Sequence, residues 1–290
     1  MVDVKYEVVH RTRYEYDAPV TVSYAQVHQL PWDVDGQTCL RRSITASPLP
    51  EHQRERVDYF GNPVAFLSID EPHDELIVTS SCLVDTTGRA VEFGPVADRP
   101  WEQYTVESQA DLVAVDFSLD SPLVAATARL ADLASESFTP GRSLAEATSG
   151  LSSLIHRSFH FKPGSTDVTT TIDEVFDLGE GVCQDFAHVM IGCLRSVGIP
   201  AGYVSGYLET VPPPGKERLT GVDRTHAWVS VYLGDGNWVG IDPTNDQLAG
   251  PRYITTARGR DYSDVPPLKG VIYTDAEEST LTVEVDVVPA

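Results

Sequence analysis

The sequence GVCQDFAH, residues 181–188, marks the start of a helix with a cysteine in its first turn. A glycine-rich break precedes it, and Gly198 followed by Pro200 is typical of a helix end. Between these limits the apolar residues recur at the spacing of one helix face, at Phe186, Ala187, Met190, Cys193, Leu194 and Val197. We therefore predict a long, largely buried helix that opens near Cys183.

Cys183 lies where a thiol can become reactive. Backbone N–H groups and the helix dipole at a helix start favour a thiolate, whereas Glu180 and Asp185 are nearby acids that oppose it and would need a histidinium to offset them. The alternative is a small residue buried at a helix start, because free cysteines are often core residues. Gly181 allows the backbone to approach a substrate closely, and Gln184 is a candidate to line the site.

The region before this helix carries further helix signals. Ser143 and Thr171 are each followed three residues later by glutamate, which predicts two capping boxes and two helices. A third helix is expected to run from near Pro122 to about residue 134, with the proline close to its first helical position.

The first hundred residues have the pattern of β structure. Apolar and polar residues alternate between Val4 and Tyr16, with a break near His10. Ala18-Pro19 predicts a turn into a second strand, and more short strands follow, separated by Gly, Pro and Asn. Such a series favours a sandwich or barrel. Alternation at the end of the chain predicts one last strand there.

Strand periodicity returns after the central helix. Three strands are predicted, at residues 202–209, 225–233 and 238–242. The polar loop at residues 212–223 is long enough to form a rim or lid over a site. His226 and Trp228 share one face of the middle strand, where a rigidly held histidine can serve as a general base and the tryptophan can wall a site. A lone strand histidine is more often structural, and Trp228 is equally compatible with a core position.

The turn between the last two strands decides which residue faces His226. Gly234-Asp235-Gly236 is predicted as a three-residue hairpin loop with Gly236 in the left-handed conformation. This loop pairs Trp228 with Asp242 and puts Asp242 on the His226 face, roughly 7–8 Å away diagonally at Cα. A two-residue loop would put Asp242 on the wrong face. Asp242 also precedes a proline, as a turn starter does, and the two roles are compatible.

Composition disfavours several kinds of partner. The 290-residue chain has 21 basic and 43 acidic residues and a formal net charge of −22, so its surface should repel nucleic acid and anionic membranes. No apolar run is long enough to span a bilayer, and the first residues lack the pattern of a signal peptide, which together predict a cytoplasmic protein. No cofactor is indicated, and the absence of a Cys-x-x-Cys pair gives a metal site little support.

The remaining cysteines do not form a disulfide framework. Cys183 and Cys193 would lie about 15 Å apart along one helix, which is beyond disulfide reach. Cys39 and Cys82 have strand-like, apolar surroundings and are predicted to be buried, reduced thiols.

Four stretches resemble the core of the transglutaminase-like family. They are residues 181–188, the sequence PAGYVSGY at 200–207, THAW at 225–228 and DPTN at 242–245. Their order and spacing match the family, and the front of the chain is similar to the β domain that precedes this core in bacterial members. The resemblance implies a papain-like α+β core with Cys183 as nucleophile, His226 as base and Asp242 as the residue that orients it. Some family members cross-link glutamine to amines, and others hydrolyse peptide or amide bonds.

One family feature has no counterpart here. No tryptophan stands upstream of Cys183 where animal transglutaminases carry one for the oxyanion, and the nearest candidate, Trp101, is expected in a linker. The backbone N–H of Cys183 is a plausible oxyanion donor instead.

The chain as a whole is predicted to be an α+β protein. We expect a sandwich-like β domain at residues 1–100, a catalytic core at 101–265, and a C-terminal strand segment at 266–290 that packs on one of the two. Acyl transfer through a Cys183 thioester is expected on a peptide or protein amide, with hydrolysis favoured because water needs no second pocket. Transglutaminase activity, a catalytically silent binding module and a metal hydrolase are the alternatives, and the oligomeric state is left open.

Overall fold

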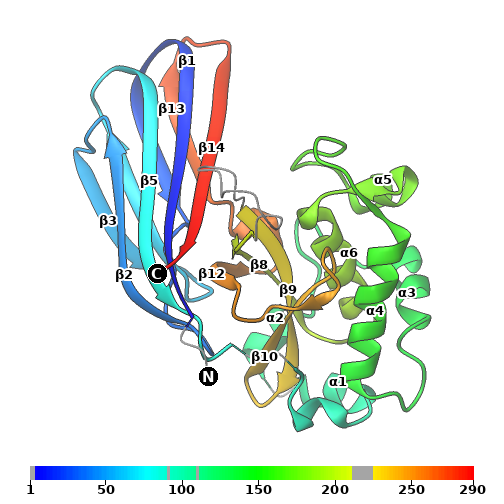
Figure 1. Cartoon of the computed structure of the whole chain (residues 1–290). Helices are drawn as coiled ribbons and strands as arrows, with labels where there is room; N and C mark the ends of the chain where they lie inside the picture. The colour runs from blue at the N-terminus through cyan, green and yellow to red at the C-terminus, as the bar shows by residue number, and fades with distance from the viewer. Residues whose placement is uncertain (1–3, 90–91, 109–110, 211–224) are drawn as a thin grey trace, which may run out of the picture.

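The computed structural model describes residues 4–89, 92–108, 111–210 and 225–290. Within these residues the strands form a seven-stranded, a five-stranded and a two-stranded sheet. The larger sheet makes an N-terminal β domain, and the five-stranded sheet with its covering helices makes the core (Figure 1). This arrangement confirms the predicted α+β class, an antiparallel β domain followed by a core in which helices pack on an antiparallel sheet. The polar loop at residues 212–223 lies outside the described residues.

One long strand organises the N-terminal domain. The strands of this domain are β1 (Lys5–Val27), β2 (Thr38–Ser47), β3 (His52–Val57), β4 (Pro63–Ile69), β5 (His73–Asp85), β13 (Leu268–Thr274) and β14 (Ser279–Pro289). The first half of β1 pairs with β5 and β14, and its second half pairs with β4 and β13. Strand β1 therefore belongs to two layers, a device that forms the corners of β sandwiches.

The two layers share an apolar core. Ala25 and Leu67 from one layer and Ile44 and Val78 from the other are buried in the same cluster. Since β13 and β14 both pair with β1, the end of the chain is part of the N-terminal sheet (Figure 1).

The predicted turn at Ala18-Pro19 falls within one continuous strand assignment. Ala18-Pro19 was expected to separate two strands, but β1 is continuous through it. The pairing of β1 with β5 shifts between Glu15 and Val20, where Pro19 has no N–H to donate to a neighbour. The chain nevertheless folds back here, because Nε2 of Gln29, just past the end of β1, lies 3.3 Å from Nε2 of His10 and 3.2 Å from Oγ1 of Thr12 in the first half of the strand.

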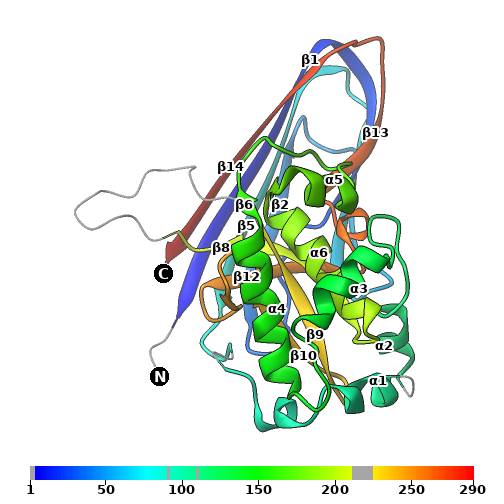
Figure 2. The ribbon, with the colours of Figure 1, turned by 90° about the vertical axis from the view of Figure 1, so that its right-hand side faces the viewer.

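The core packs helices on one face of its sheet. The strands are β8 (Ala201–Leu208), β9 (Thr225–Gly234), β10 (Asn237–Asp242), β11 (Gln247–Leu248) and β12 (Tyr253–Gly259), in the order β11-β10-β9-β8-β12. The helices are α1 (Glu102–Ser108), α2 (Leu112–Asp116), α3 (Ala128–Ser135), α4 (Leu144–Ser158), α5 (Ile172–Leu178) and α6 (Cys183–Ser196). Two short strands, β6 (His160–Phe161) and β7 (Glu180–Gly181), pair in parallel ahead of α6. Helix α6 is buried over residues 185–195 and lies between the sheet and the outer helices (Figures 1 and 2).

The helix boundaries predicted from capping residues agree with the structure. Ser143 caps α4, Thr171 and Glu174 form the capping box of α5, and Gly198 has the positive φ expected after α6. The helix predicted from Pro122 instead begins at Ala128, after a cap by Thr127. The preceding residues form a turn in which Asp261 accepts the N–H of Leu123, and this contact competes with helix formation.

The opposite face of the core sheet packs against the N-terminal domain. Tyr207 of β8 and Ile254 of β12 are buried among apolar residues of β1, β5 and β14, such as Val8 and Val285. Gln37 adds hydrogen bonds to the backbone of Thr255 at 2.8 and 3.0 Å. The core sheet is therefore covered on both faces, by helices on one side and by the β domain on the other (Figure 1).

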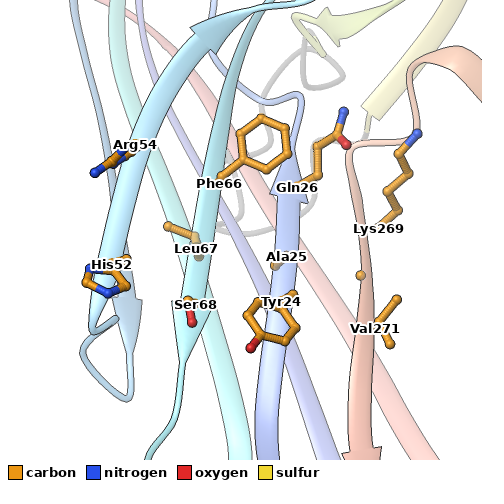
Figure 3. A pocket seen from close by; sticks show the side chains of 11 residues that line it. Tyr24, Ala25, Gln26, His52, Arg54, Phe66, Leu67, Ser68, Lys269 and Val271 are labelled. Carbon is orange, nitrogen blue, oxygen red and sulfur yellow. The ribbon is translucent and has the colours of Figure 1, made fainter.

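The N-terminal domain carries a hollow of its own. It measures about 460 Å³ and lies over β3, β4, β1 and β13, with Tyr24, Phe66 and Val271 among its lining residues (Figure 3). No residue that lines it belongs to the predicted catalytic set. No helix of the described residues is both long and apolar enough to cross a membrane.

Candidate active site

Cys183 is the first residue of α6, and its side chain is half-buried against the helical core. The helix start is held by Asp185, whose Oδ2 accepts the N–H of Val182 at 2.7 Å and the hydroxyl of Thr166 at 2.7 Å. As the first residue of the helix, Cys183 has a backbone N–H without an intrahelical acceptor. The thiol therefore lies at the positive end of a well-fixed helix dipole.

The two acids beside Cys183 are each engaged elsewhere. Burial raises the pKa of Asp185, although its hydrogen bonds to Thr166 and Val182 oppose the rise. Glu180 forms an ion pair with Lys162, with Nζ and Oε2 2.8 Å apart. The helix cap formed by Asp185 and the cation beside Glu180 thus weaken the destabilising effect that these two acids were expected to have on a Cys183 thiolate.

His226 and Asp242 are in direct contact. Nε2 of His226 lies 2.7 Å from Oδ2 of Asp242, and the Asp242 side chain is completely buried while that of His226 is 11% exposed. His226 stands at the beginning of β9 and Asp242 at the end of β10, so adjacent strands bring the two together.

The turn between β9 and β10 differs from the predicted one, although the pairing of the two strands at Asp242 is the same. Gly234 pairs with Asn237 across a two-residue turn, Asp235-Gly236, in which both residues have positive φ. The pairing then shifts, so that Trp238 faces Tyr232 and Leu233 is the extra residue of a bulge. A two-residue turn alone would have turned Asp242 to the other face, but the bulge compensates. The two changes cancel, and Asp242 lies on the His226 face as predicted.

Several donors fix the Asp242 carboxylate. Oδ2 accepts from the Tyr253 hydroxyl and from Asn245 Nδ2, each at 2.7 Å, and Oδ1 accepts from the N–H of Thr244 at 2.8 Å. Sequence reasoning missed Tyr253 and the role of Asn245. Asn245 lies in the quoted DPTN stretch, but Tyr253 comes from β12 at the far edge of the sheet, and nothing in its local pattern links it to Asp242.

The electrostatics of the site favour a charged imidazole. Burial lowers the pKa of His226, but hydrogen bonds to Asp242 and Cys183 and the negative charges of both groups outweigh it and raise the pKa to about 10. Burial would raise the pKa of Asp242, yet its bond to His226 and those from Tyr253 and Asn245 keep the pKa below its usual value. Since Nε2 is bound to Asp242, Nδ1 is the ring nitrogen left for the interaction with Cys183. His226 thus interacts with both Cys183 and Asp242, and Asp242 is the anionic member.

Trp228 supports the histidine from behind. Its indole is buried and packs on the His226 ring, with centroids 6.2 Å apart and planes inclined by 27°. On the neighbouring strand Gly206 leaves room for it, because a Cβ there would lie 2.6 Å from the indole. Trp228 thus fixes the ring that carries the proton.

The two other predicted site residues have different surroundings. A Cβ on Gly181 would lie 2.8 Å from Oδ2 of Asp185, so this glycine makes room for the helix cap. Gln184 follows Cys183 in the first turn of α6 and is partly exposed. Gln184 is therefore open to contact a bound molecule, whereas the small size of Gly181 is already explained by packing.

The other cysteines lie in environments that suppress ionisation. Burial raises the pKa of Cys82 to about 12 and that of Cys193 still further. Burial also raises the pKa of Cys39, against the effect of nearby Arg42. Cys183 differs from them in position, because it is half-buried at the first residue of α6.

Other histidines and Trp101 have structural contacts. His188 is buried, accepts the N–H of Tyr262 at 3.2 Å, and has its pKa lowered by burial to about 4, which makes it a neutral packing residue. The Trp101 indole donates to the carbonyl of Thr139 at 3.0 Å, so it is engaged outside the site. Among the described residues no group of His, Cys, Asp and Glu is arranged to hold a metal ion.

Comparison with protein families gives two matches. Residues 131–243 match the transglutaminase-like superfamily, and residues 6–85 match the bacterial transglutaminase-like N-terminal region. The first range contains Cys183, His226 and Asp242, so the contact described above lies inside the matched core.

Individual relatives extend these matches over the whole chain. An uncharacterized protein of Mycobacterium tuberculosis (strain ATCC 25618 / H37Rv) is 43% identical over 292 residues, which cover 98% of this chain and 93% of the relative. A protein-glutamine gamma-glutamyltransferase of Pseudomonas aeruginosa is 34% identical over 88 residues, 30% of this chain and 13% of that protein. The crystal structure of a proposed cysteine protease from Cytophaga hutchinsonii aligns with a TM-score of 0.72 at 20% identity, covering 100% of this chain and 94% of that one. The last likeness extends the shared fold to both domains.

Proposed function

The chain belongs to the transglutaminase-like superfamily, and on that basis we propose that it is a cysteine-dependent enzyme that cleaves amide bonds through a thioester on Cys183. The observation that carries the proposal is the contact of His226 with the buried Asp242 carboxylate, together with the interaction with Cys183 that helps to raise the pKa of His226. A silent binding module would have no need for an ionised carboxylate held at zero exposure behind a histidine.

The first chemical step forms the thioester. The Cys183 thiolate attacks the carbonyl carbon of the amide, and the carbonyl electrons move onto oxygen, where the Cys183 N–H is placed to stabilise the charge. The imidazolium of His226 then gives its proton to the departing nitrogen as the C–N bond breaks. An amine leaves, and the acyl group stays on sulfur.

The second step regenerates the enzyme. His226, now neutral, takes a proton from a water molecule whose oxygen attacks the thioester carbon. The C–S bond breaks, a carboxylic acid departs, and the thiolate and imidazolium are restored. Asp242 stays ionised throughout and holds the imidazole in the orientation and tautomer that both steps require.

Water is proposed as the acceptor because it needs no second pocket. Transfer to an amine is the alternative, and it is favoured by the likeness of 88 residues to the gamma-glutamyltransferase of Pseudomonas aeruginosa. The proposed substrate is a peptide or protein amide, either in the backbone or in a glutamine side chain. A cytoplasmic location stays a prediction from the sequence.

A competition experiment distinguishes the two acceptors. The protein is incubated with a library of glutamine-containing peptides, with and without a primary amine such as cadaverine, and the products are identified by mass spectrometry. Hydrolysis predicts new carboxylates whether or not the amine is present, and transfer predicts amine adducts at the expense of carboxylates. Cys183→Ala should abolish either product, and Cys39→Ala is the matched control that should leave the products unchanged. Equal product from Cys183→Ala and the unmodified chain would refute a thioester at this residue.

A further inference from the structure

A second cavity lies between the N-terminal domain and the core sheet. It measures about 500 Å³, within the range of small-molecule sites. Trp32 and Arg89 line it from the N-terminal side, and Trp228, Trp238 and Arg258 line it from the core. None of Cys183, His226 and Asp242 lines it, although it shares the Trp228 indole with them.

Arg258 gives this cavity a half-buried cation whose Nε atom is buried without an acceptor. Its guanidinium stacks over Trp238 and Phe117, with Cζ 4.8 and 5.4 Å from the ring centroids. Its Nε is buried without a hydrogen-bond acceptor, and in the described part of the chain no carboxylate forms an ion pair with it. The backbone on either side is fixed, because Asn62 bonds both the N–H and the carbonyl of Arg258. A cation held at such a place without a partner is costly for the fold and calls for an anion.

Two further donors in the same cavity are also unsatisfied. Arg89 uses Nη2 to bond Gln37 at 2.8 Å and Thr255 at 2.6 Å, but its Nε is buried without an acceptor. The indole N–H of Trp32 is likewise buried and unbonded. Three orphaned donors that line one cavity indicate a missing acceptor, since buried donors in folded proteins are almost always paired.

The acids around the cavity limit the charge of that acceptor. Asp33, Asp35 and Asp111 also line it. Asp33 accepts the N–H of Cys39 at 2.8 Å, and Asp111 accepts the N–H of Val113 at 2.9 Å and the hydroxyl of Tyr232 at 3.0 Å. Asp35 lies near enough to Arg89 to oppose the lowering of its pKa by burial. Two arginines stand against three aspartates in the lining, so its formal charge is −1. This disfavours a dianion such as phosphate, and it leaves a single charge that directed hydrogen bonds from the orphaned donors must hold.

We propose that this cavity binds a small monocarboxylate with an aromatic or other apolar body. The planar carboxylate matches the geometry of guanidinium donors from Arg258 and Arg89, and the faces of Trp32, Trp228 and Trp238 accommodate the apolar part. Since none of Cys183, His226 and Asp242 lines this cavity, the proposal does not depend on the chemistry of Cys183.

Phenylacetate and its uncharged isostere phenylacetamide test the proposal by isothermal titration calorimetry on the full chain. Phenylacetate should bind roughly tenfold or more tightly, as expected for a charge-assisted hydrogen bond. Arg258→Gln and Arg89→Gln should each remove that preference, while Arg129→Gln, an exposed arginine on α3, should keep it. Cys183→Ala should bind phenylacetate with unchanged affinity.

Several outcomes would overturn the proposal. Equal binding of the acid and the amide, no binding of phenylacetate, or tighter binding of inorganic phosphate would each contradict a monocarboxylate site. Loss of binding in Cys183→Ala would place the ligand at the catalytic cysteine instead. If Arg258→Gln does not fold, Arg89→Gln and Trp32→Phe decide the matter, because Trp32→Phe keeps an aromatic ring while it removes an orphaned donor.

Discussion

The Nε2 atom of His226 and the Oδ2 atom of Asp242 are 2.7 Å apart, although sixteen positions and a hairpin separate the residues in sequence. The Asp242 carboxylate can neither turn nor move outward without leaving Tyr253, Asn245 or the Thr244 N–H without an acceptor. The position of the His226 imidazole is therefore set by a carboxylate that is itself held by several donors. Substitutions at Asp242 and at these donors should change turnover and stability in predictable ways.

Asp242→Asn should reduce turnover by several orders of magnitude. The side chains are similar in size, so the fold should persist, but an amide can present an N–H to His226 and permit the wrong tautomer. The amide also places donors against Tyr253 and Asn245, which should lower the free energy of unfolding by about 1–3 kcal/mol. Steady-state kinetics with denaturant unfolding checks both effects. An Asp242→Asn variant with undiminished turnover would contradict the assigned role.

Tyr253→Phe should reduce turnover far less and destabilise the protein by about 1.5–3 kcal/mol. The substitution keeps the ring that packs on Trp228 and removes the hydroxyl that donates to Asp242. Tyr59→Phe is a matched control, because it removes a bond from an exposed tyrosine to Asp116, where little stability is expected to be lost. Thermal and urea unfolding of both variants measures the loss of stability. Equal losses in the two variants would show that the buried Tyr253–Asp242 bond stabilises the protein no more than the exposed one.

Alkylation of the native protein should select one cysteine of four. A mild alkylating agent should modify Cys183 well before Cys39, Cys82 and Cys193, because burial raises the pKa of the other three thiols and protects at least two of them. Peptide mapping by mass spectrometry after graded exposure measures the order. Similar modification of all four in the folded protein would count against a specialised thiol.

The formation of the thioester should decline only at high pH. The raised pKa of His226, about 10, means that the imidazolium persists well above its ordinary range near 6.5 and can still protonate the leaving nitrogen there. The rate of acylation in single-turnover experiments should therefore hold across neutral pH and fall as pH rises through about 10. A fall centred near pH 6.5 would show that the contacts to Asp242 and Cys183 do not raise the pKa of the histidine.

Much of the site could be predicted because its parts carry local signals. The glycine break and helical spacing locate Cys183 at a helix start, and strand alternation with a turn locates His226 opposite Asp242. The actual turn, Asp235-Gly236 with a bulge at Leu233, was not predicted, since the bulge depends on how the strand packs on the helices.

What the sequence did not reveal depends on contacts between distant segments. Tyr253 reaches Asp242 from another strand, and the periodicity of β12 gives no indication of this bond. The sharing of β1 between two layers depends on β13 and β14 from the end of the chain. Helices α1 and α2, of seven and five residues, are too short to show a helical period, and neither was predicted.

The most direct test of the central claim is the pH dependence of Cys183 alkylation in the unmodified chain and in His226→Gln. A thiolate paired with an imidazolium should react with iodoacetamide already at pH 6, where an ordinary thiol with a pKa of about 8.5 is almost fully protonated. The His226→Gln variant, compared with His52→Gln as a control at an exposed position on β3, should lose this reactivity at pH 6 and regain it only as pH rises toward 8.5. A rate that rises near pH 8.5 in the unmodified chain, and that His226→Gln leaves unchanged, would contradict the proposed pair of Cys183 and His226.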